Sequence, residues 1–332
     1  IEVIPIFESV QIILSADTIL DDYITLSQDI FHEKVSYMRP FLARSDPALN
    51  SGIVATTLAI KWALSQFAKL STRRGIPLYP IIAPGALPFR GGLTPETTQE
   101  FLDEFAGIRT LVIQSAFRYD FDKADVAKAI KKIQAEMPHL EARLIEPELF
   151  PYFLYITNLF EKSYRETVEQ MALFISQVSH FIPARRERMQ HIGLFGYSRR
   201  VGENLLPRAI GFTAASYSLG IPAELFGLGK AIKQAQKEGY WNVVTEYYPS
   251  LKSHITRAGK FFRRQSLEAL NMIEMEKELP VLEEFTGEPL GPVTASENEH
   301  AKLIGQIIDS LKNDQNPQDF IEQAAVLRKS LG

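Results

Sequence analysis

The stretch VSYMRPFLARSDPALNSGIVATTLAIKWALSQFAKL, residues 35–70, shows the strand–helix unit of this protein in its clearest form. Its first part, VSYMRPFLA (35–43), is a short β-branched and aromatic run that is typical of a strand, and the stretch from Pro47 to Leu70 has the pattern of a helix. Further strand-like runs are found at 2–7, 76–83, 109–114, 141–147 and 191–198. Because helical stretches separate most of these runs, the chain is predicted to form a mostly parallel sheet or barrel.

After about residue 224 the pattern becomes almost wholly helical. We therefore expect the later β/α units of a barrel in residues 1–223, and a C-terminal helical part of the same domain in residues 224–332. Six candidate strands are too few for a closed eight-stranded barrel. Since the chain begins at Ile1, inside a strand-like run, we expect the missing strands in an N-terminal segment that precedes it. The predicted fold class is α/β, a TIM-type (β/α) barrel enlarged by many α-helices.

The composition of the 332 residues excludes several classes of protein. A formal net charge of −4 lacks the basic excess that non-specific nucleic-acid binding requires, so we expect no nucleic-acid partner. No run of about 18 uncharged apolar residues is present, so we expect no membrane span. The chain has no cysteine, which excludes disulfides, thiolate catalysis and cysteine-ligated metals and is compatible with a reducing, cytoplasmic location. The six histidines never have the i, i+4 spacing of a helical zinc pair.

Polar residues follow the ends of most predicted strands, and they include two carboxylates, one amide and several arginines. In chain order they are Glu8, Asp46, Arg90 with Gly91 and Gly92, Gln114, Arg199 with Arg200, and Arg208. In a parallel α/β barrel the C-terminal ends of the strands share one face, and the active site is built there. We therefore expect these side chains to converge at one rim.

Each of these residues also has a structural explanation when it is taken alone. Ser45-Asp46-Pro47 is an ordinary helix start, and Glu8 fits a solvated residue at a strand end. The stretch Arg90–Gly92 fits a tight turn before a capped helix, and Arg199 and Arg208 fit surface charges. The hypothesis of an active site depends on finding all of them together.

A rim of this composition suits a small phosphorylated carboxylic acid. Mg²⁺ or Mn²⁺ is commonly held by one or two carboxylates together with water and substrate oxygens, so Glu8 and Asp46 are the predicted ligands. Arginine presents a planar fork that matches phosphate and carboxylate groups. The glycines beside Arg90 let backbone N–H groups approach an anion closely. A metal at this rim would also stabilise an enolate as its negative charge develops.

As an ordered set, the motifs resemble those of phosphoenolpyruvate carboxylase, and most closely its shorter archaeal-type branch. In chain order they are Ile4–Glu8 (PLFE in the family), Ser45–Gly52 (YSDS.KD.G), Phe89–Gly92 (GRGG), Gln114–Tyr119 (TEQGE…R), Gly196–Arg199 (GSRP) and Arg208–Ile210 (LRAIPW). Near the end, Arg264 with Leu270-Asn271 is similar to R…DPLN, a region tied to feedback inhibition by dicarboxylates. The resemblance runs from Ile1 to the end of the chain.

This resemblance implies a lyase that joins phosphoenolpyruvate and bicarbonate into oxaloacetate and phosphate, with Mg²⁺ or Mn²⁺ as cofactor and a homotetramer as the assembly. It implies that Glu8 and Asp46 bind the metal and that Arg90, Arg199 and Arg208 are catalytic. It gives as substrate-binding residues Arg90, Gly91, Gly92, Gln114, Ser198, Arg199 and Arg208. It places a possible effector site at Arg264.

The chain departs from the family pattern in three respects, one of which is that Asn50 replaces a lysine. Gly92 runs straight into Leu93, so the second GRGG repeat of the larger enzymes is absent. The family's catalytic histidine and a further phosphate-binding arginine belong to its N-terminal part, which we expect to precede this chain.

Two alternatives stay open. The first is another metal-dependent barrel enzyme that acts on phosphoenolpyruvate or a pyruvate enolate, such as a lyase or an aldolase. It would share the metal and the arginines but show no bicarbonate dependence. The second is a non-catalytic helical module whose arginines serve an oligomer interface, and it would not bind a metal together with phosphoenolpyruvate.

Overall fold

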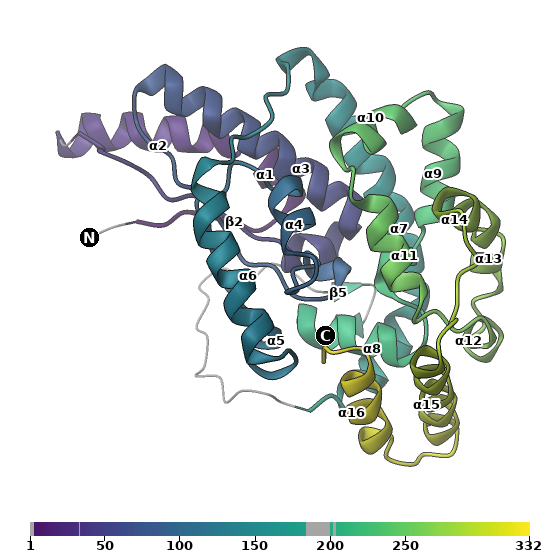
Figure 1. Ribbon diagram of the computed structural model, residues 1–332. Coiled ribbons are helices and arrows are strands. Elements are labelled where there is room, and N and C mark those ends of the chain that lie inside the picture. The colour runs from purple at the N-terminus through teal and green to yellow at the C-terminus, as the bar shows by residue number, and fades with distance from the viewer. Residues whose placement is uncertain (1–2, 33, 184–199, 202–203) are drawn as a thin grey trace. The chain divides into compact units, whose positions relative to one another are not determined.

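The computed structural model of this mostly helical α/β protein is shown in Figure 1. The described residues are 3–32, 34–183, 200–201 and 204–332. Two compact units are present, of which unit 1 comprises Ile1–Lys162 and Ala231–His254, and unit 2 comprises Ser163–Lys230 and Ile255–Gly332. No helix within the described ranges is long and apolar enough to cross a membrane.

Unit 1 contains a four-stranded sheet in the order β1-β2-β3-β4, in which every pair of neighbours is parallel. The strands are β1 (Ile6–Phe7), β2 (Phe41–Leu42), β3 (Ile81–Ile82) and β4 (Thr110–Leu111). Their order in the sheet is their order in the chain, so each helical connection returns to the strand beside the one it left. The prediction of an α/β fold with a parallel sheet is confirmed, and the four C-terminal strand ends lie at one edge.

The predicted strand at 141–147 is not present, so that part of the prediction is wrong. The backbone of this segment is held by the long helix α3 (Ser45–Arg74) and not by a neighbouring strand. The N–H of Ile145 donates to Ser65 Oγ at 2.8 Å, and the carbonyl of Ile145 accepts from Lys69 Nζ at 2.5 Å. Side chains of a helix therefore satisfy the backbone groups that a sheet would have paired.

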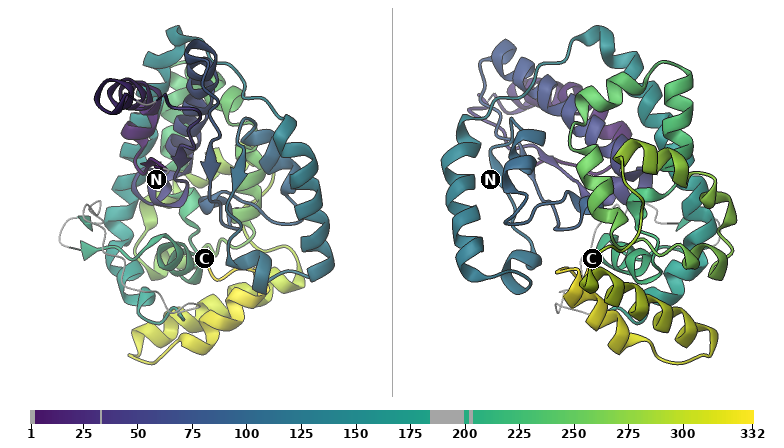
Figure 2. Two further views of the ribbon diagram at one scale, coloured as in Figure 1. Left: turned by 90° about the vertical axis from the view of Figure 1, so that its left-hand side faces the viewer. Right: turned by 45° about the vertical axis from the view of Figure 1, so that its right-hand side comes forward.

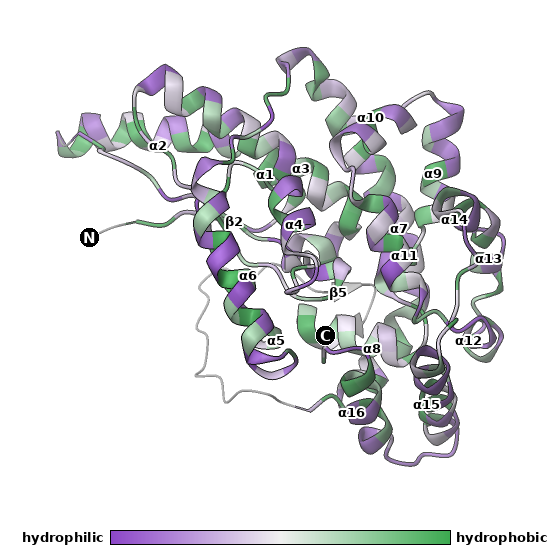
Figure 3. Ribbon diagram, in the orientation of Figure 1, coloured by the Kyte–Doolittle hydropathy of each residue, from purple (hydrophilic) through white to green (hydrophobic). Residues whose placement is uncertain are grey.

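Helix α3 is the central helix of unit 1 and is buried along most of its length. In Figure 3 its colours are mostly white to green, whereas α6 (Lys123–Glu136) alternates between purple and green, as a helix with one exposed face does. The helix is interrupted at Gly52, whose φ of 78° and ψ of 172° are not helical. A residue with a Cβ rarely adopts this φ, and the break sets residues 45–51, about two turns of helix, off from the long body that follows.

The remaining elements of unit 1 connect and flank these strands. Both views of Figure 2 show α5 (Ser115–Tyr119) and α6 beside the sheet. The other elements within unit 1 are α1 (Val10–Leu14), α2 (Ala16–Phe31), η1 (Pro88–Arg90), α4 (Thr98–Glu104), η2 (Met137–His139), η3 (Pro147–Leu149) and α10 (Trp241–Tyr247). Three helices continue from one unit into the other along the chain, namely α7 (Phe150–Ser179), α9 (Leu228–Lys237) and α11 (Leu251–Gly259).

The described part of unit 2 is helical apart from one short antiparallel pair, β5 (Arg200–Val201) and β6 (Asn204–Leu205). Its helices are α8 (Ala209–Ser218), η4 (Ala223–Leu225), α12 (Gln265–Ala269), α13 (Ile273–Glu276), α14 (Leu279–Thr286), α15 (Ala295–Lys312) and α16 (Gln318–Leu327). Helix α15 begins with a capping box between Thr294 and Glu297. The predicted strand at 191–198 lies outside the described residues.

A buried polar cluster lies within the helices of unit 2. The imidazole of His300 on α15 is 0% exposed, and its Nε2 lies 3.5 Å from Arg328 Nη1, which can only donate. The guanidinium of Arg328 also lies over the ring of Tyr217, whose hydroxyl donates to Glu224 Oε1 at 2.8 Å. Burial, and secondarily the charge of Arg328, lower the pKa of His300 to about 3. The ring is therefore neutral at physiological pH.

We expect this histidine to make the protein sensitive to acid. Below the usual histidine pKa of about 6.5 the unfolded chain binds a proton at His300, but the folded protein does not until about pH 3. The free energy of unfolding should therefore fall as the pH drops through this window, by about 2 kcal/mol between pH 7.5 and pH 5. Chemical denaturation at the two pH values measures the loss, which His300→Gln should reduce and the exposed control His139→Gln should not. Equal losses in the wild type and His300→Gln would contradict the prediction.

Candidate active site

Glu8 and Asp46 leave the sheet at the same edge, from two neighbouring strands. Glu8 directly follows β1, and Asp46 lies in the first turn of α3, shortly after β2. Since Phe7 pairs with Leu42 in parallel register, the chain leaves both strands in the same direction. The two side chains are partly exposed. The two predicted metal ligands thus lie beyond adjacent strand ends.

The donor set of these two residues fits a hard divalent cation. Among the residues that the structure describes, no group of three or more histidine, aspartate or glutamate side chains gathers into a metal cluster. A closed cage of protein ligands is not what Mg²⁺ requires, because this ion keeps several waters and is commonly held by one or two carboxylates with substrate oxygens. Glu8 and Asp46 supply that number of carboxylates.

Arg90 connects the residues that follow three different strands. Its Nη2 donates to Gln114 Oε1, beyond β4, and its Nε donates to Ser45 Oγ, beyond β2, at 3.3 Å. Gln114 in turn donates through Nε2 to the carbonyl of Ala83, beyond β3, at 2.9 Å. Arg90 is only 5% exposed, so its guanidinium is anchored in a defined place beside the first turn of α3.

The loop that carries Arg90 is closed by its own backbone. The N–H of Gly85 donates to the carbonyl of Arg90 at 2.7 Å, and the N–H of Leu93 donates to the carbonyl of Gly85 at 3.0 Å. Between these bonds, Gly91 has a φ of 123°, and a Cβ built on it would lie 2.6 Å from Pro84 Cβ. Both the backbone conformation and the lack of space therefore require glycine at this position.

The backbone N–H groups of this loop donate hydrogen bonds to carbonyls of the same loop. The N–H groups of Arg90 and Gly92 both donate to the carbonyl of Leu87, at 2.9 and 3.0 Å, and that of Gly91 donates to the carbonyl of Pro88 at 3.0 Å. From the sequence we expected the amides beside Arg90 to approach an anion. In the structure they shape the turn, and the guanidinium of Arg90 supplies the positive charge.

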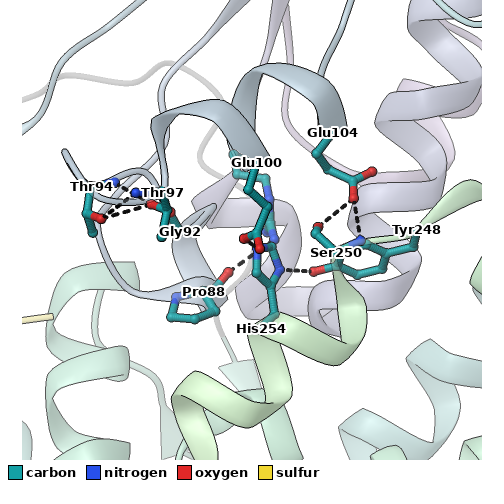
Figure 4. Close-up of polar contacts among 10 residues, drawn as sticks. Pro88, Gly92, Thr94, Thr97, Glu100, Glu104, Tyr248, Ser250 and His254 are labelled. Atoms are coloured by element: carbon teal, nitrogen blue, oxygen red, sulfur yellow. Dashed lines mark hydrogen bonds and ion pairs between the residues drawn. The ribbon is translucent and has the colours of Figure 1, made fainter. Parts of the chain in front are cut away.

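Helix α4 is attached to this loop through its first residues, as Figure 4 shows. Thr97, the N-cap of α4, donates through Oγ1 to the carbonyl of Gly92 at 2.6 Å. The same hydroxyl accepts from the N–H of Thr94 at 2.9 Å. Any shift of α4 along its axis would therefore move Gly92 and the turn that contains Arg90.

The other end of α4 is fixed by residues far along the chain (Figure 4). Glu104 is 2% exposed, accepts from the N–H of Ser250 at 3.0 Å and forms an ion pair of 2.9 Å with Lys61. Glu100 lies 3.5 Å from His254 Nε2, and His254 Nδ1 lies 2.6 Å from the hydroxyl of Tyr248. These contacts hold α4 between α3 and the segment 248–254.

Sequence reasoning did not identify this supporting network. Its only signal in the sequence is the pair Glu100 and Glu104, which have helical i, i+4 spacing beside the apolar residues Phe101 and Phe105. An acidic residue next to an apolar helix face indicates a buried partner, but the pattern does not say which residue that partner is. Two of the partners, Ser250 and His254, lie about 150 positions away in the chain, and Lys61 lies on a different helix.

The other predicted site residues belong to unit 2 or lie outside the described residues. Ser198 and Arg199 fall in the latter group. Arg208 is the N-cap residue of α8, with an exposed side chain and no side-chain capping bond. Arg264, the predicted effector residue, forms an ion pair of 2.8 Å with Glu283 on α14.

Comparison with known proteins gives a consistent family assignment. A family model described as phosphoenolpyruvate carboxylase matches residues 1–332. Enzymes named phosphoenolpyruvate carboxylase from Metallosphaera sedula, Methanospirillum hungatei and Oenococcus oeni are 36%, 39% and 32% identical to the chain over 343, 338 and 337 residues. Each alignment covers 100% of this chain and 65%, 64% and 66% of the respective relative. The chain thus spans slightly less than two thirds of the length of these relatives.

Proposed function

Because this chain belongs to the phosphoenolpyruvate carboxylase family, we propose that it takes part in the Mg²⁺-dependent carboxylation of phosphoenolpyruvate by bicarbonate, which yields oxaloacetate and phosphate. In this reaction an oxygen of bicarbonate attacks phosphorus and the enol ester bond breaks, which gives carboxyphosphate and the enolate of pyruvate. Carboxyphosphate then separates into CO₂ and phosphate. The methylene carbon of the enolate attacks CO₂ and forms the new carbon–carbon bond.

The proposed metal site consists of Glu8 and Asp46. Two carboxylates at adjacent strand ends suit Mg²⁺ or Mn²⁺, which would complete its shell with water and substrate oxygens. When bound, the metal supplies positive charge that stabilises the developing enolate oxygen. The two carboxylates then fix where that charge is placed.

The proposed phosphate grip is built around Arg90. Its guanidinium is already oriented by Ser45 and Gln114, so little side-chain entropy remains to be lost when substrate binds. In this proposal Arg90, Arg199 and Arg208 are catalytic, and the substrate-binding residues are Arg90, Gly91, Gly92, Gln114, Ser198, Arg199 and Arg208. Gly91 and Gly92 contribute by shaping the turn, and Gln114 contributes by holding the guanidinium. A fork of two nitrogen donors would balance the phosphate charge during transfer.

We also propose the larger features that the family suggests. These are a TIM-type (β/α) barrel to which the four described strands contribute, a homotetramer, and an effector site near Arg264. The parallel order β1-β2-β3-β4 supports the barrel, because consecutive strands of a (β/α) barrel are neighbours.

One observation carries the proposal. Residues beyond β2, β3 and β4 meet at the guanidinium of Arg90, at the edge of the sheet where Glu8 and Asp46 also emerge, in a chain that matches this family over its whole length. The C-terminal strand ends of a parallel sheet are where α/β enzymes bind their substrates.

The decisive experiment follows oxaloacetate formed from phosphoenolpyruvate and Mg²⁺, with and without bicarbonate, through coupled reduction by malate dehydrogenase. It is run on this chain and on the longest protein that its gene encodes. We expect bicarbonate-dependent product from the longest form, and the result for this chain shows whether any additional residues are needed. Product without bicarbonate would favour another enolate enzyme, and no product from a folded protein would refute the carboxylase.

A further inference from the structure

We infer that Arg44 is a positioning residue that sets the place of Arg90. This inference rests on the proposed function, because it assigns Arg44 to the same phosphate grip. Arg44 lies between β2 and α3 and is 1% exposed, which makes it one of the largest fully buried side chains of the protein. Its Nη1 donates to the carbonyl of Phe89 at 3.1 Å, and its Nη2 donates to the carbonyl of Pro88 at 3.4 Å.

A buried arginine needs a specific reason to be retained. A guanidinium does not lose its proton in a protein, so its burial is costly unless the charge is compensated. Arg44 donates through its two terminal nitrogens, Nη1 and Nη2, to two consecutive carbonyls of the short turn η1. Lysine carries the same charge but has no planar fork, and it cannot reproduce this geometry.

The bond to Phe89 acts directly on Arg90. The carbonyl of Phe89 and the N–H of Arg90 belong to one peptide unit, which is planar. The carbonyl is held by Arg44 Nη1, and the N–H is held by the carbonyl of Leu87 at 2.9 Å. Both polar groups of this peptide unit are thereby held in place. The orientation of the peptide plane in turn sets the position of the Arg90 Cα and the direction in which its side chain leaves the backbone.

The aliphatic stem of Arg44 also lies close to the turn at Gly91. A Cβ built on Gly91 would lie 3.4 Å from Arg44 Cγ, so the arginine stem lies beside the face of this glycine where a side chain would project. Phe89, whose carbonyl Arg44 holds, is itself completely buried. Loss of the guanidinium would leave two buried carbonyls with fewer donors and would loosen the turn at Arg90.

Three consecutive residues then share one task. Arg44 holds the backbone that leads into Arg90, Ser45 holds the guanidinium of Arg90, and Asp46 is the proposed metal ligand. Since they occupy the same short stretch at the start of α3, the distance between the metal and the phosphate grip is set by the chain itself. This arrangement gives Arg44 a role in substrate geometry without any contact to the substrate.

The test compares Arg44→Lys with Arg109→Lys in the protein of full natural length. Arg109 is a matched control, because its Nη1 also donates to two backbone carbonyls, those of Ile108 and Leu140, but at the amino end of β4. We expect Arg44→Lys to raise the KM for phosphoenolpyruvate at least about 10-fold, while Mn²⁺ binding measured by electron paramagnetic resonance changes less than about 2-fold. Arg109→Lys should change neither quantity. An unchanged KM in an active Arg44→Lys variant overturns the inference, whereas an inactive wild type overturns the proposed function.

A second measurement does not depend on activity. Hydrogen exchange followed by mass spectrometry should show slow exchange for residues 85–93 of the wild type, and at least about 10-fold faster exchange there in Arg44→Lys. Exchange elsewhere in unit 1 should be unchanged. Fast exchange of this loop in the wild type would overturn the inference even if the variant does not fold, because it would show that Arg44 does not hold the turn.

Discussion

Asp46→Ala is expected to lower metal-dependent turnover by about three orders of magnitude or more, even at saturating Mg²⁺. The proposed site has only two protein carboxylates, so removal of one leaves the cation with a single protein ligand. The expected loss is therefore in both metal affinity and kcat. Steady-state kinetics at several Mg²⁺ concentrations, together with Mn²⁺ binding by electron paramagnetic resonance, separate the two effects.

A matched control is Asp125→Ala. Asp125 lies in the first turn of α6, as Asp46 does in α3, but it is exposed and forms an ion pair of 3.5 Å with Lys128 on the same helix. This control accounts for the loss of an acidic residue near a helix N-terminus, which by itself costs about 0.3–1 kcal/mol of stability. Normal turnover of Asp46→Ala at saturating Mg²⁺ would remove Asp46 from the metal site.

Arg90→Lys is expected to lower kcat/KM for phosphoenolpyruvate by about two to four orders of magnitude. The guanidinium contacts Ser45 and Gln114 with separate nitrogens, and an ammonium group cannot reach both positions at once. The amide oxygen of Gln114 would then lose a charge-assisted donor in a partly buried place, which adds to the cost of the substitution. The kinetics should be read together with thermal unfolding, so that a loss of turnover is not confused with a loss of fold.

Arg73→Lys provides the comparison for this variant. Arg73 is an exposed arginine on the same helix as Ser45 and pairs with Asp21 at 3.0 Å, an ion pair of the surface kind that contributes little to stability. Its replacement should leave kcat/KM unchanged. If Arg90→Lys also retained normal kcat/KM, the anchored guanidinium would not be part of the phosphate grip.

The sheet could be predicted from the sequence because its signals are local. Each of the four strands lies inside a short β-branched or aromatic run. The helix between β2 and β3 starts at the predicted stretch Ser45-Asp46-Pro47, but its N-cap residue is Arg44 and no side-chain capping bond is present at this helix start. The run 141–147 has the same composition, but α3 provides Ser65 and Lys69 as partners for Ile145 and removes the need for a neighbouring strand. Composition alone cannot distinguish these two outcomes, since the difference lies in the tertiary partner.

The residues of the candidate site also fall into two groups, those that have a local signal in the sequence and those that do not. Glu8, Asp46, Arg90 and Gln114 could be chosen from their positions after predicted strands, and the structure places all four beyond C-terminal strand ends. Arg44 could not be chosen, because an arginine beside a helix start usually faces solvent. The partners of α4 in the segment 248–254 could not be predicted either, since nothing in the local sequence indicates which distant residue contacts a buried carboxylate.

The order of the sheet has a practical consequence for work with this chain. Among the described strands, β1 and β4 have one neighbour each, and Ile6 on β1 is 51% exposed. An open strand edge presents unpaired backbone groups to any other polypeptide, and apolar side chains beside it favour aggregation. In concentrated preparations of the isolated chain, β1 is therefore one place where aggregation could begin. A charged residue in place of Ile6 is the substitution that such preparations would benefit from first.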